Sequence, residues 1–133
     1  MTPDEKKALV REFSAVLISG DRAATLARMS EDPTWVFWGE ARPGIDGVKT
    51  IIDAFWQLYR PGTINCEFER QYVEGDVVIS QMILSATTFK GEPYRNRYVS
   101  FTHLKGDKVH KVEEYLDTAY AAQKFAGWQE AKA

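Results

Sequence analysis

The hydrophobic pattern of this chain changes its period near residue 64, and this change limits the folds open to the sequence. Before that point, apolar residues recur at the i, i+3, i+4 spacing of amphipathic helices. After it, apolar and polar residues alternate as in strands with one buried face, and tight turns separate the alternating segments. Helices followed by antiparallel hairpins predict an α+β fold. The length of 133 residues suits one core, so we expect one domain over residues 1–133.

Three helices and one short strand are predicted in the front half. Residues 2–5 have the form of a capping box with proline at the first helical position. Asp21 can cap a second, shorter helix, and a third helix is expected from Asp46 until Pro61 ends its pattern. Between the last two, residues 34–38 are too β-branched and aromatic for a helix, which predicts a strand.

Four strands joined as a meander are predicted in the back half. The first begins at residue 64 and ends before a turn at residues 74–76. The others cover residues 77–88, 94–104 and 109–118. The tail after residue 119 is expected to form a short helix or an arm packed across the sheet.

The composition argues against several kinds of partner. With 17 basic and 19 acidic residues the formal charge is −2, and without a basic run we expect no nucleic-acid binding. No apolar stretch is long enough for a signal peptide or a membrane span, so we expect a cytoplasmic protein without a membrane partner. The single cysteine, Cys66, cannot form an intramolecular disulfide, and no Cys/His group has metal-site spacing. We therefore expect neither a metal nor a cofactor.

The last predicted strand contains three carboxylates within five positions, and one of them is the strongest candidate for chemistry. Successive side chains of a strand point to opposite faces, so Glu114 shares a face with Val112 and Leu116. Glu113 and Asp117 fall on the other face. A carboxylate between two apolar neighbours on a half-buried face is costly unless it has a role. Glu114 is therefore the candidate acid–base residue.

The order of these elements resembles the nuclear transport factor 2-like fold over nearly the whole chain. The segments that carry the resemblance are residues 13–21, 30–33, 44–47, 74–78, 107–109 and 114–117. Within that superfamily the sequence looks most like the SnoaL-like and ketosteroid isomerase-related group. The resemblance implies a cone, in which a strongly curved antiparallel four-strand meander and a short N-terminal strand wrap three N-terminal helices around an apolar pocket.

The ketosteroid isomerase template implies a catalytic triad that this sequence lacks. Such enzymes need a carboxylate base, a tyrosine and a protonated aspartate. The corresponding positions here hold Phe37, Phe13 and Ser100. Phenylalanine can neither accept nor donate the proton that this chemistry moves. The usual steroid isomerase mechanism is therefore not expected.

Limonene epoxide hydrolases offer a second template, which uses an Asp–Arg–Asp arrangement with a tyrosine and an asparagine that hold a water. The matching positions of the charged groups are Ile83, Gln81 and Glu114, and the water-holding positions are Trp35 and Phe37. Epoxide opening needs both a base and an acid. Only one carboxylate remains here, so this mechanism is not expected either.

These substitutions imply a pocket that is more apolar than either template. The candidate ligand-binding residues are Phe13, Trp35, Phe37, Phe55, Gln81, Ile83, Asn96, Tyr98 and Ser100. An apolar cavity with a few convergent polar groups is the usual form of a small-molecule site. Burial among aromatic side chains should raise the pKa of Glu114, as a proton shuttle requires. In the alternative interpretation, Gln81 hydrogen-bonds Glu114 and the pair is a structural contact.

Two functions follow from this pocket. The first is an isomerase, lyase or hydrolase that acts on a small hydrophobic molecule with Glu114 as its acid–base residue. The second is a non-catalytic protein that binds an apolar ligand. On the opposite face of the sheet lie Val99, Phe101 and Tyr115. Because relatives often pair two subunits through that outer face, the resemblance implies a homodimer.

Overall fold

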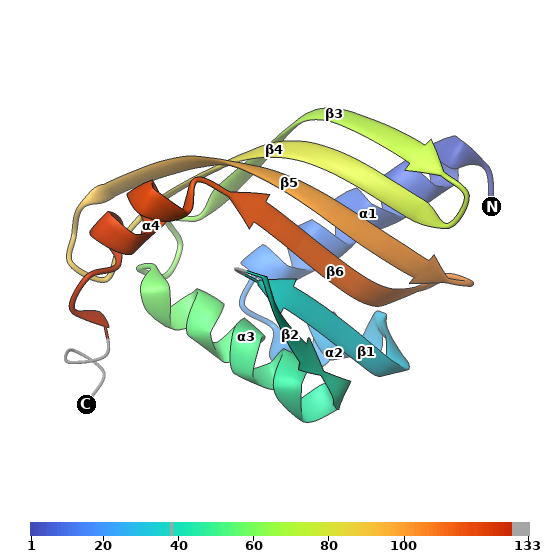
Figure 1. The fold of residues 1–133 in the computed structure, drawn as a ribbon, viewed down its shortest axis with the longest axis horizontal. Helices are drawn as coiled ribbons and strands as arrows, with labels where there is room; N and C mark the ends of the chain where they lie inside the picture. Colours follow the sequence, from blue (N-terminus) through green and yellow to red (C-terminus); the bar gives the residue numbers. More distant parts are fainter. Residues whose placement is uncertain (38, 129–133) are drawn as a thin grey trace.

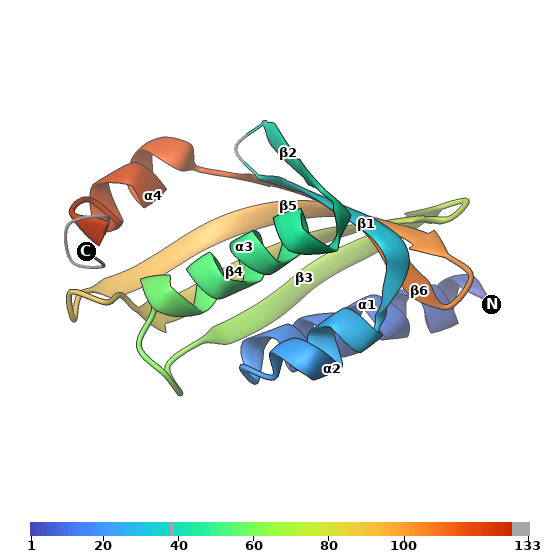
Figure 2. The ribbon, with the colours of Figure 1, turned by 90° about the horizontal axis from the view of Figure 1, so that it is seen from below.

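The protein folds as a curved sheet around helices (Figure 1), and the structure, a computed structural model, describes residues 1–37 and 39–128. The helices are α1 (Pro3–Ile18), α2 (Arg22–Ala27), α3 (Gly44–Leu58) and α4 (Thr118–Lys124). The strands are β1 (Met29–Phe37), β2 (Glu40–Pro43), β3 (Asn65–Glu74), β4 (Val77–Thr87), β5 (Pro93–Lys105) and β6 (Lys108–Leu116). Figure 2 shows α1, α2 and α3 on the concave side of the sheet. The predicted α+β cone is confirmed.

The helix starts follow from capping chemistry. The Thr2 hydroxyl accepts a hydrogen bond from the Glu5 backbone N–H at 3.1 Å, and the Glu5 carboxylate accepts one from the Thr2 N–H at 3.0 Å. Asp21 caps α2 by accepting a hydrogen bond from the Ala24 N–H at 2.9 Å. These two starts are as predicted, whereas α3 begins at Gly44, ahead of the expected start at Asp46.

The strands of the back half form the predicted antiparallel meander β3-β4-β5-β6. The register of the meander aligns one row of inward-facing side chains. Ser80 of β4 lies opposite Ser100 of β5, which in turn lies opposite Glu114 of β6. On the other side of β6, Glu114 pairs with Phe37 of β1. The row brings one carboxylate into the middle of the concave face.

The front half contains more sheet than predicted. In place of one strand at residues 34–38, β1 begins at Met29 and β2 follows it as an antiparallel partner; Trp38 lies outside the described residues. The sequence signal was weak because residues 31–33 are two acids and a proline, which have low strand propensity. Parallel pairing with β6 holds β1 in the sheet. α3 packs against this hairpin so closely that a Cβ on Gly47 would lie 2.8 Å from the Arg42 carbonyl carbon.

The core lies between the concave face and the helices. Its fully buried members include Val48 and Ile52 of α3 and Val78 of β4, each 0% exposed. A second apolar cluster forms at the other end of the sheet, where Tyr94 stacks on Phe125 with ring centroids 4.9 Å apart. The tail therefore forms the short helix α4 and packs on the sheet, in agreement with one of the two predicted arrangements.

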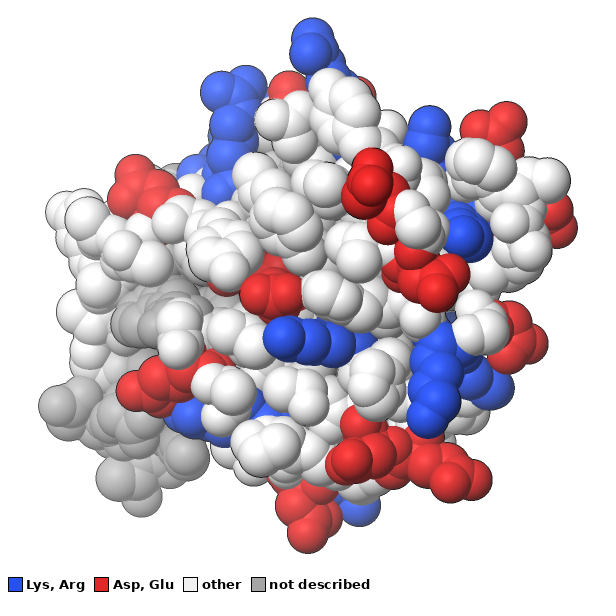
Figure 3. Space-filling model, turned by 45° about the vertical axis from the view of Figure 1, so that its right-hand side comes forward, with Lys and Arg blue, Asp and Glu red and all other residues white. Residues whose placement is uncertain are grey.

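The helices and the charged side chains of the surface bear on the predictions about membrane and nucleic-acid partners. No helix in the described part of the chain is both long and apolar enough to cross a membrane. On the face drawn in Figure 3, basic and acidic side chains are interspersed among uncharged ones. The absence of nucleic-acid partners and the cytoplasmic location stay predictions.

Candidate functional site

Glu114 lies on the concave face of β6, where its carboxylate has one protein partner. The Trp35 indole N–H donates a hydrogen bond to Glu114 Oε1 at 2.8 Å. The side chain is half-buried, and it lines a cavity together with Trp35. Trp35 itself is only 3% exposed. Parallel pairing of β1 with β6 creates this contact, because it places Trp35 beside Val112 and Phe37 beside Glu114.

Burial raises the pKa of Glu114 from 4.5 to about 7, and the hydrogen bond from Trp35 offsets only part of that rise. The carboxylate loses hydration in a site lined mainly by apolar atoms, so its charged form becomes costly. A pKa near 7 allows the group both to accept and to release a proton near neutral pH. The direction agrees with the shift expected from its apolar neighbours.

The cavity beside Glu114 has two adjoining lobes. The first lobe leaves about 70 Å³ for the centres of water-sized molecules and the second about 60 Å³. Since one such molecule needs roughly 10–15 Å³ by this measure, each lobe has room for a small organic group. The residues that line both lobes are Leu17, Trp35, Phe55, Tyr98 and Glu114. Glu114 therefore lies where the two lobes meet.

A buried group of tyrosines lies at one end of the cavity. The hydroxyls of Tyr94 and Tyr98 are 2.7 Å apart, and the Tyr59 hydroxyl hydrogen-bonds with both. Burial raises the pKa of Tyr98 far above its ordinary value, and the nearby carboxylate of Glu114 raises it further. The three hydroxyls therefore stay protonated and supply neutral hydrogen-bond donors near the carboxylate.

Most of the predicted pocket residues come together in this cavity. Phe13, Trp35, Phe55, Tyr98 and Ser100 line the first lobe with Glu114, and Phe37 lines the second. Whether any of them contacts a ligand stays a prediction. Asn96 does not line either lobe. Its amide donates to the Tyr94 hydroxyl at 3.1 Å and to the Asp117 carbonyl at 3.0 Å, so it supports the tyrosine group from behind.

Two predicted pocket residues, Gln81 and Ile83, are on the wrong side of the sheet. Gln81 is exposed and lines a surface hollow with Arg97, and Ile83 pairs with Arg97 across the β4–β5 ladder. Because side chains alternate along a strand, a shift of one residue in the alignment moved both positions to the opposite face. The alternative in which Gln81 hydrogen-bonds Glu114 is therefore also wrong, and Trp35 takes that role.

The inward residues of β4 include Ser80, Met82 and Leu84, and the last two line the first lobe. Sequence reasoning also missed Thr102, which lines this lobe and whose hydroxyl lies 3.2 Å from that of Ser100. Its position two residues beyond Ser100 on the same strand was the available signal. Cys66 lines the lobe as well. Burial raises the pKa of its thiol.

The described residues offer no group for holding a metal ion. In residues 1–37 and 39–128, no three His, Cys, Asp or Glu side chains lie close enough together to share one. The two histidines have other partners. His103 Nε2 lies 2.7 Å from the Glu113 carboxylate, and His110 Nδ1 lies 2.7 Å from the Ser30 hydroxyl. The chemistry available at the cavity is therefore that of one carboxylate and several hydroxyls.

Comparison with known proteins relates this geometry to one family. The sequence model of the SnoaL-like domain matches residues 10–112. None of the curated proteins matches the sequence significantly.

Solved structures of the same shape come from several bacteria. A proposed SnoaL-like polyketide cyclase from Jannaschia sp. CCS1 superposes with a TM-score of 0.78 at 14% identity, over 92% of each chain. An NTF2-like protein from Burkholderia xenovorans LB400 gives 0.72 at 18% identity, over 93% of this chain and 98% of that one. A ketosteroid isomerase-like protein from Catenulispora acidiphila, solved with trimethylamine, gives 0.75 at 13% identity, over 87% and 90%. At these identities the likeness concerns the fold.

Proposed function

The chain belongs to the SnoaL-like domain family, and we propose that it is an enzyme that moves a proton within a small, largely apolar molecule. The observation that carries the proposal is Glu114, a carboxylate whose pKa is raised to about 7 at the junction of two apolar lobes. A general base works best when its pKa lies near the working pH. A buried carboxylate with a purely structural role is usually satisfied by several hydrogen bonds. The Glu114 carboxylate accepts a single one from the described residues.

An isomerisation fits the site better than a hydrolysis. In a 1,3-proton shift of a β,γ-unsaturated carbonyl compound, one carboxylate takes a proton from the carbon next to the carbonyl and returns it to the γ carbon, while the double bond moves to the α,β position. The substrate keeps its atoms, and Glu114 ends as it began. Opening an epoxide by water needs a second acid, and Glu114 is the one carboxylate that lines the lobes in the described residues.

The negative charge that develops on the carbonyl oxygen needs hydrogen-bond donors. Tyr98 and Ser100 line the first lobe with Glu114 and carry hydroxyl groups. The Tyr98 hydroxyl belongs to the tyrosine group, whose raised pKa values keep it protonated. In this proposal these hydroxyls stabilise the enolate while Glu114 holds the proton. The Jannaschia relative is named a SnoaL-like polyketide cyclase.

Hydrogen–deuterium exchange tests this common first step without knowledge of the natural substrate. Small ketones incubated with the protein in D₂O should gain deuterium at the carbon next to the carbonyl, as followed by NMR. Glu114→Gln should slow the protein-dependent exchange by about 10²–10⁴-fold, the usual contribution of a general base. Glu113→Gln is the matched control, because it removes the neighbouring carboxylate on the outer face and should leave exchange unchanged. Equal exchange in wild type and Glu114→Gln would contradict the proposal.

The second candidate is a non-catalytic protein that stores or senses an apolar ligand. The mainly apolar lining of both lobes favours it. In that case, small ketones should raise the melting temperature of wild type and of Glu114→Gln, and neither protein should exchange deuterium. The same two variants therefore separate the candidates. We retain the cytoplasm as the proposed location.

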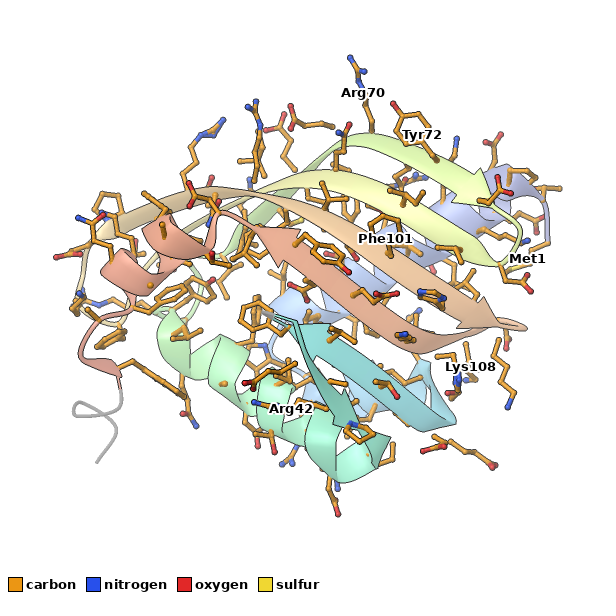
Figure 4. All side chains as sticks on the ribbon, viewed as in Figure 1. Met1, Arg42, Arg70, Tyr72, Phe101 and Lys108 are labelled. Atoms are coloured by element: carbon orange, nitrogen blue, oxygen red, sulfur yellow. The ribbon has the colours of Figure 1, made fainter. Side chains whose placement is uncertain are left out.

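We also propose a homodimer that pairs through the outer face of the sheet. Tyr72 and Tyr115 are each 51% exposed on that face. The Phe101 and Tyr115 rings pack edge to face with centroids 5.8 Å apart, and Ile79 lies between Phe101 and Tyr72 in the register. Figure 4 shows Phe101 on β5 and Tyr72 on β3. An apolar patch across four strands is typical of a surface that a partner covers.

Substitution of the exposed tyrosines tests the dimer. The double variant Tyr72→Lys, Tyr115→Lys should be monomeric at concentrations where wild type is dimeric, because it places charge in the apolar patch. Light scattering coupled to size-exclusion chromatography measures the mass. Since both side chains are exposed in the single chain, the fold should survive. Gln57→Lys on α3 should remain dimeric, and a monomeric wild type would contradict this proposal.

A further inference from the structure

A surface hollow between α1 and β3 adjoins the first lobe of the cavity. The hollow leaves about 330 Å³ for the centres of water-sized molecules. Four of its lining residues, Ser14, Ile18, Cys66 and Phe68, also line the first lobe. Figure 2 shows α1 running beside β3, so this hollow lies over the seam between a helix and an edge strand. Because the hollow and the first lobe share these four lining residues, we call the hollow the mouth.

Arg11 is the one charged residue of the described chain that lines the mouth. It lies one helical turn before Ser14 on the same side of α1. Its guanidinium donates a hydrogen bond to the side-chain oxygen of Gln71 on β3. That partner is a neutral amide, and within the described residues Arg11 forms no ion pair. Most of its donor groups therefore remain free for a ligand.

The amide that holds Arg11 is itself fixed to the fold. Gln71 donates to the Lys7 carbonyl at 3.2 Å and to the Ser80 hydroxyl at 3.3 Å. Ser80 is 0% exposed and belongs to the inward row that leads to Glu114. The chain of contacts from Ser80 through Gln71 to Arg11 orients the guanidinium over the mouth. The nearest acidic residues of β3 point to the outer face, where Glu69 pairs with Arg97 at 3.2 Å.

The charges of the site are therefore separated. A cation without a carboxylate partner lies at the mouth, apolar residues line the wall, and Glu114 lies at the junction of the lobes. A molecule with an anionic group at one end and an apolar body matches this order. Its anionic group avoids the charge repulsion and desolvation that it would meet beside Glu114, and it gains charge-assisted hydrogen bonds from an arginine.

We propose that the mouth between α1 and β3 binds the carboxylate of small carboxylic acids through Arg11, with the apolar body of the acid directed into the cavity. For an enzyme this makes the substrate class a keto acid, and that extension rests on the proposed acid–base role of Glu114. The binding step itself does not require catalysis. Arg11 is then a specificity-determining residue, and Gln71 is a positioning residue.

A pair of ligands of equal length tests the binding step. Hexanoate and hexanamide differ in charge and share the same apolar chain, and calorimetric titration gives the affinity of each. Wild type should bind hexanoate about tenfold more tightly than hexanamide, the gain expected from a charge-assisted contact at a partly exposed site. Arg11→Gln should remove this preference while leaving hexanamide binding unchanged. Arg22→Gln, which alters another exposed arginine on α2, should keep the full preference.

Outcomes at Glu114 separate this proposal from the catalytic one. Glu114→Gln should retain the preference for hexanoate, because the carboxylate binds at the mouth. If Arg11→Gln retains the preference, or if wild type has none, the mouth proposal is overturned even where Glu114-dependent deuterium exchange stands. If Glu114→Gln strengthens the preference instead, the anion binds beside residue 114, where loss of the carboxylate relieves charge repulsion, and the proposal is again overturned. Loss of the preference in Arg11→Gln without any exchange would support the mouth and remove the catalytic role.

Discussion

Glu114→Gln should be more stable than wild type above pH 7, by about 3 kcal/mol in the free energy of unfolding. The pKa of Glu114 is about 7 in the folded protein and 4.5 without the fold, so the folded state binds more protons between these values. Wild-type stability therefore falls as the pH rises from 4.5 to 7, by about 1.4 kcal/mol per unit for this group, and stays lower above pH 7. Glutamine carries no charge at any pH and removes this loss.

Chemical denaturation of both proteins at pH 5, 6, 7 and 8 measures the effect. The difference between the two unfolding free energies should grow with pH and level off above pH 7. Glu113→Gln is the control, because that carboxylate lies on the outer face and its pKa shifts in the opposite direction. Burial acts to raise the pKa of Glu113, but the hydrogen bond from His103 and the charge of Lys111 lower it overall. Parallel pH profiles for wild type and Glu114→Gln would rule out the buried, titrating carboxylate.

Trp35→Phe should raise the pKa of Glu114 above 7 by a further one to two units. The indole N–H is the hydrogen-bond donor to this carboxylate, and a hydrogen bond to a charged group contributes about 1.5–3 kcal/mol. Its loss affects only the ionised form, and about 1.4 kcal/mol corresponds to one pKa unit. Carbon-13 NMR of the labelled glutamate carboxyl measures the titration directly.

Trp56→Phe provides a matched control for this second prediction. Trp56 is half-buried, and its indole N–H likewise donates a hydrogen bond, but its acceptor is the Leu17 carbonyl at 2.7 Å. Its removal should lower stability without moving the Glu114 titration. If both variants shift the pKa equally, the cause is general repacking around the cavity. If neither variant shifts the pKa, the Trp35 hydrogen bond does not hold the pKa of Glu114 down.

The placement of Glu114 was predictable from the sequence because its strand has one clear face. Val112 and Leu116 are apolar, and the intervening residues are charged or aromatic, so the alternation selects one side for Glu114. Strand β4 gives no such guide. Its run from Val77 to Leu84 carries apolar side chains on both faces, so the pattern did not reveal the one-residue shift that misplaced Gln81 and Ile83.

The helix starts and the meander were predictable for a related reason. Capping boxes, turn residues and alternation act over a few neighbouring residues, so the sequence carries them locally. Residues 29–33 have no such local signal, and their strand forms because β6 offers a parallel partner far away in the chain. The hairpin of β1 and β2 was missed for the same cause.

By itself, the sequence determined the meander of the back half and the face on which Glu114 lies, because each depends on local periodicity, and its resemblance to known proteins indicated the fold family. Only the tertiary structure decided what surrounds that carboxylate. Its hydrogen bond comes from Trp35, 79 residues away in the chain, and its cavity is lined by α1, α3 and the concave face of the sheet. The pKa that makes Glu114 a candidate base follows from this desolvation. No run of neighbouring residues encodes it, because elements from both halves of the chain together exclude the water.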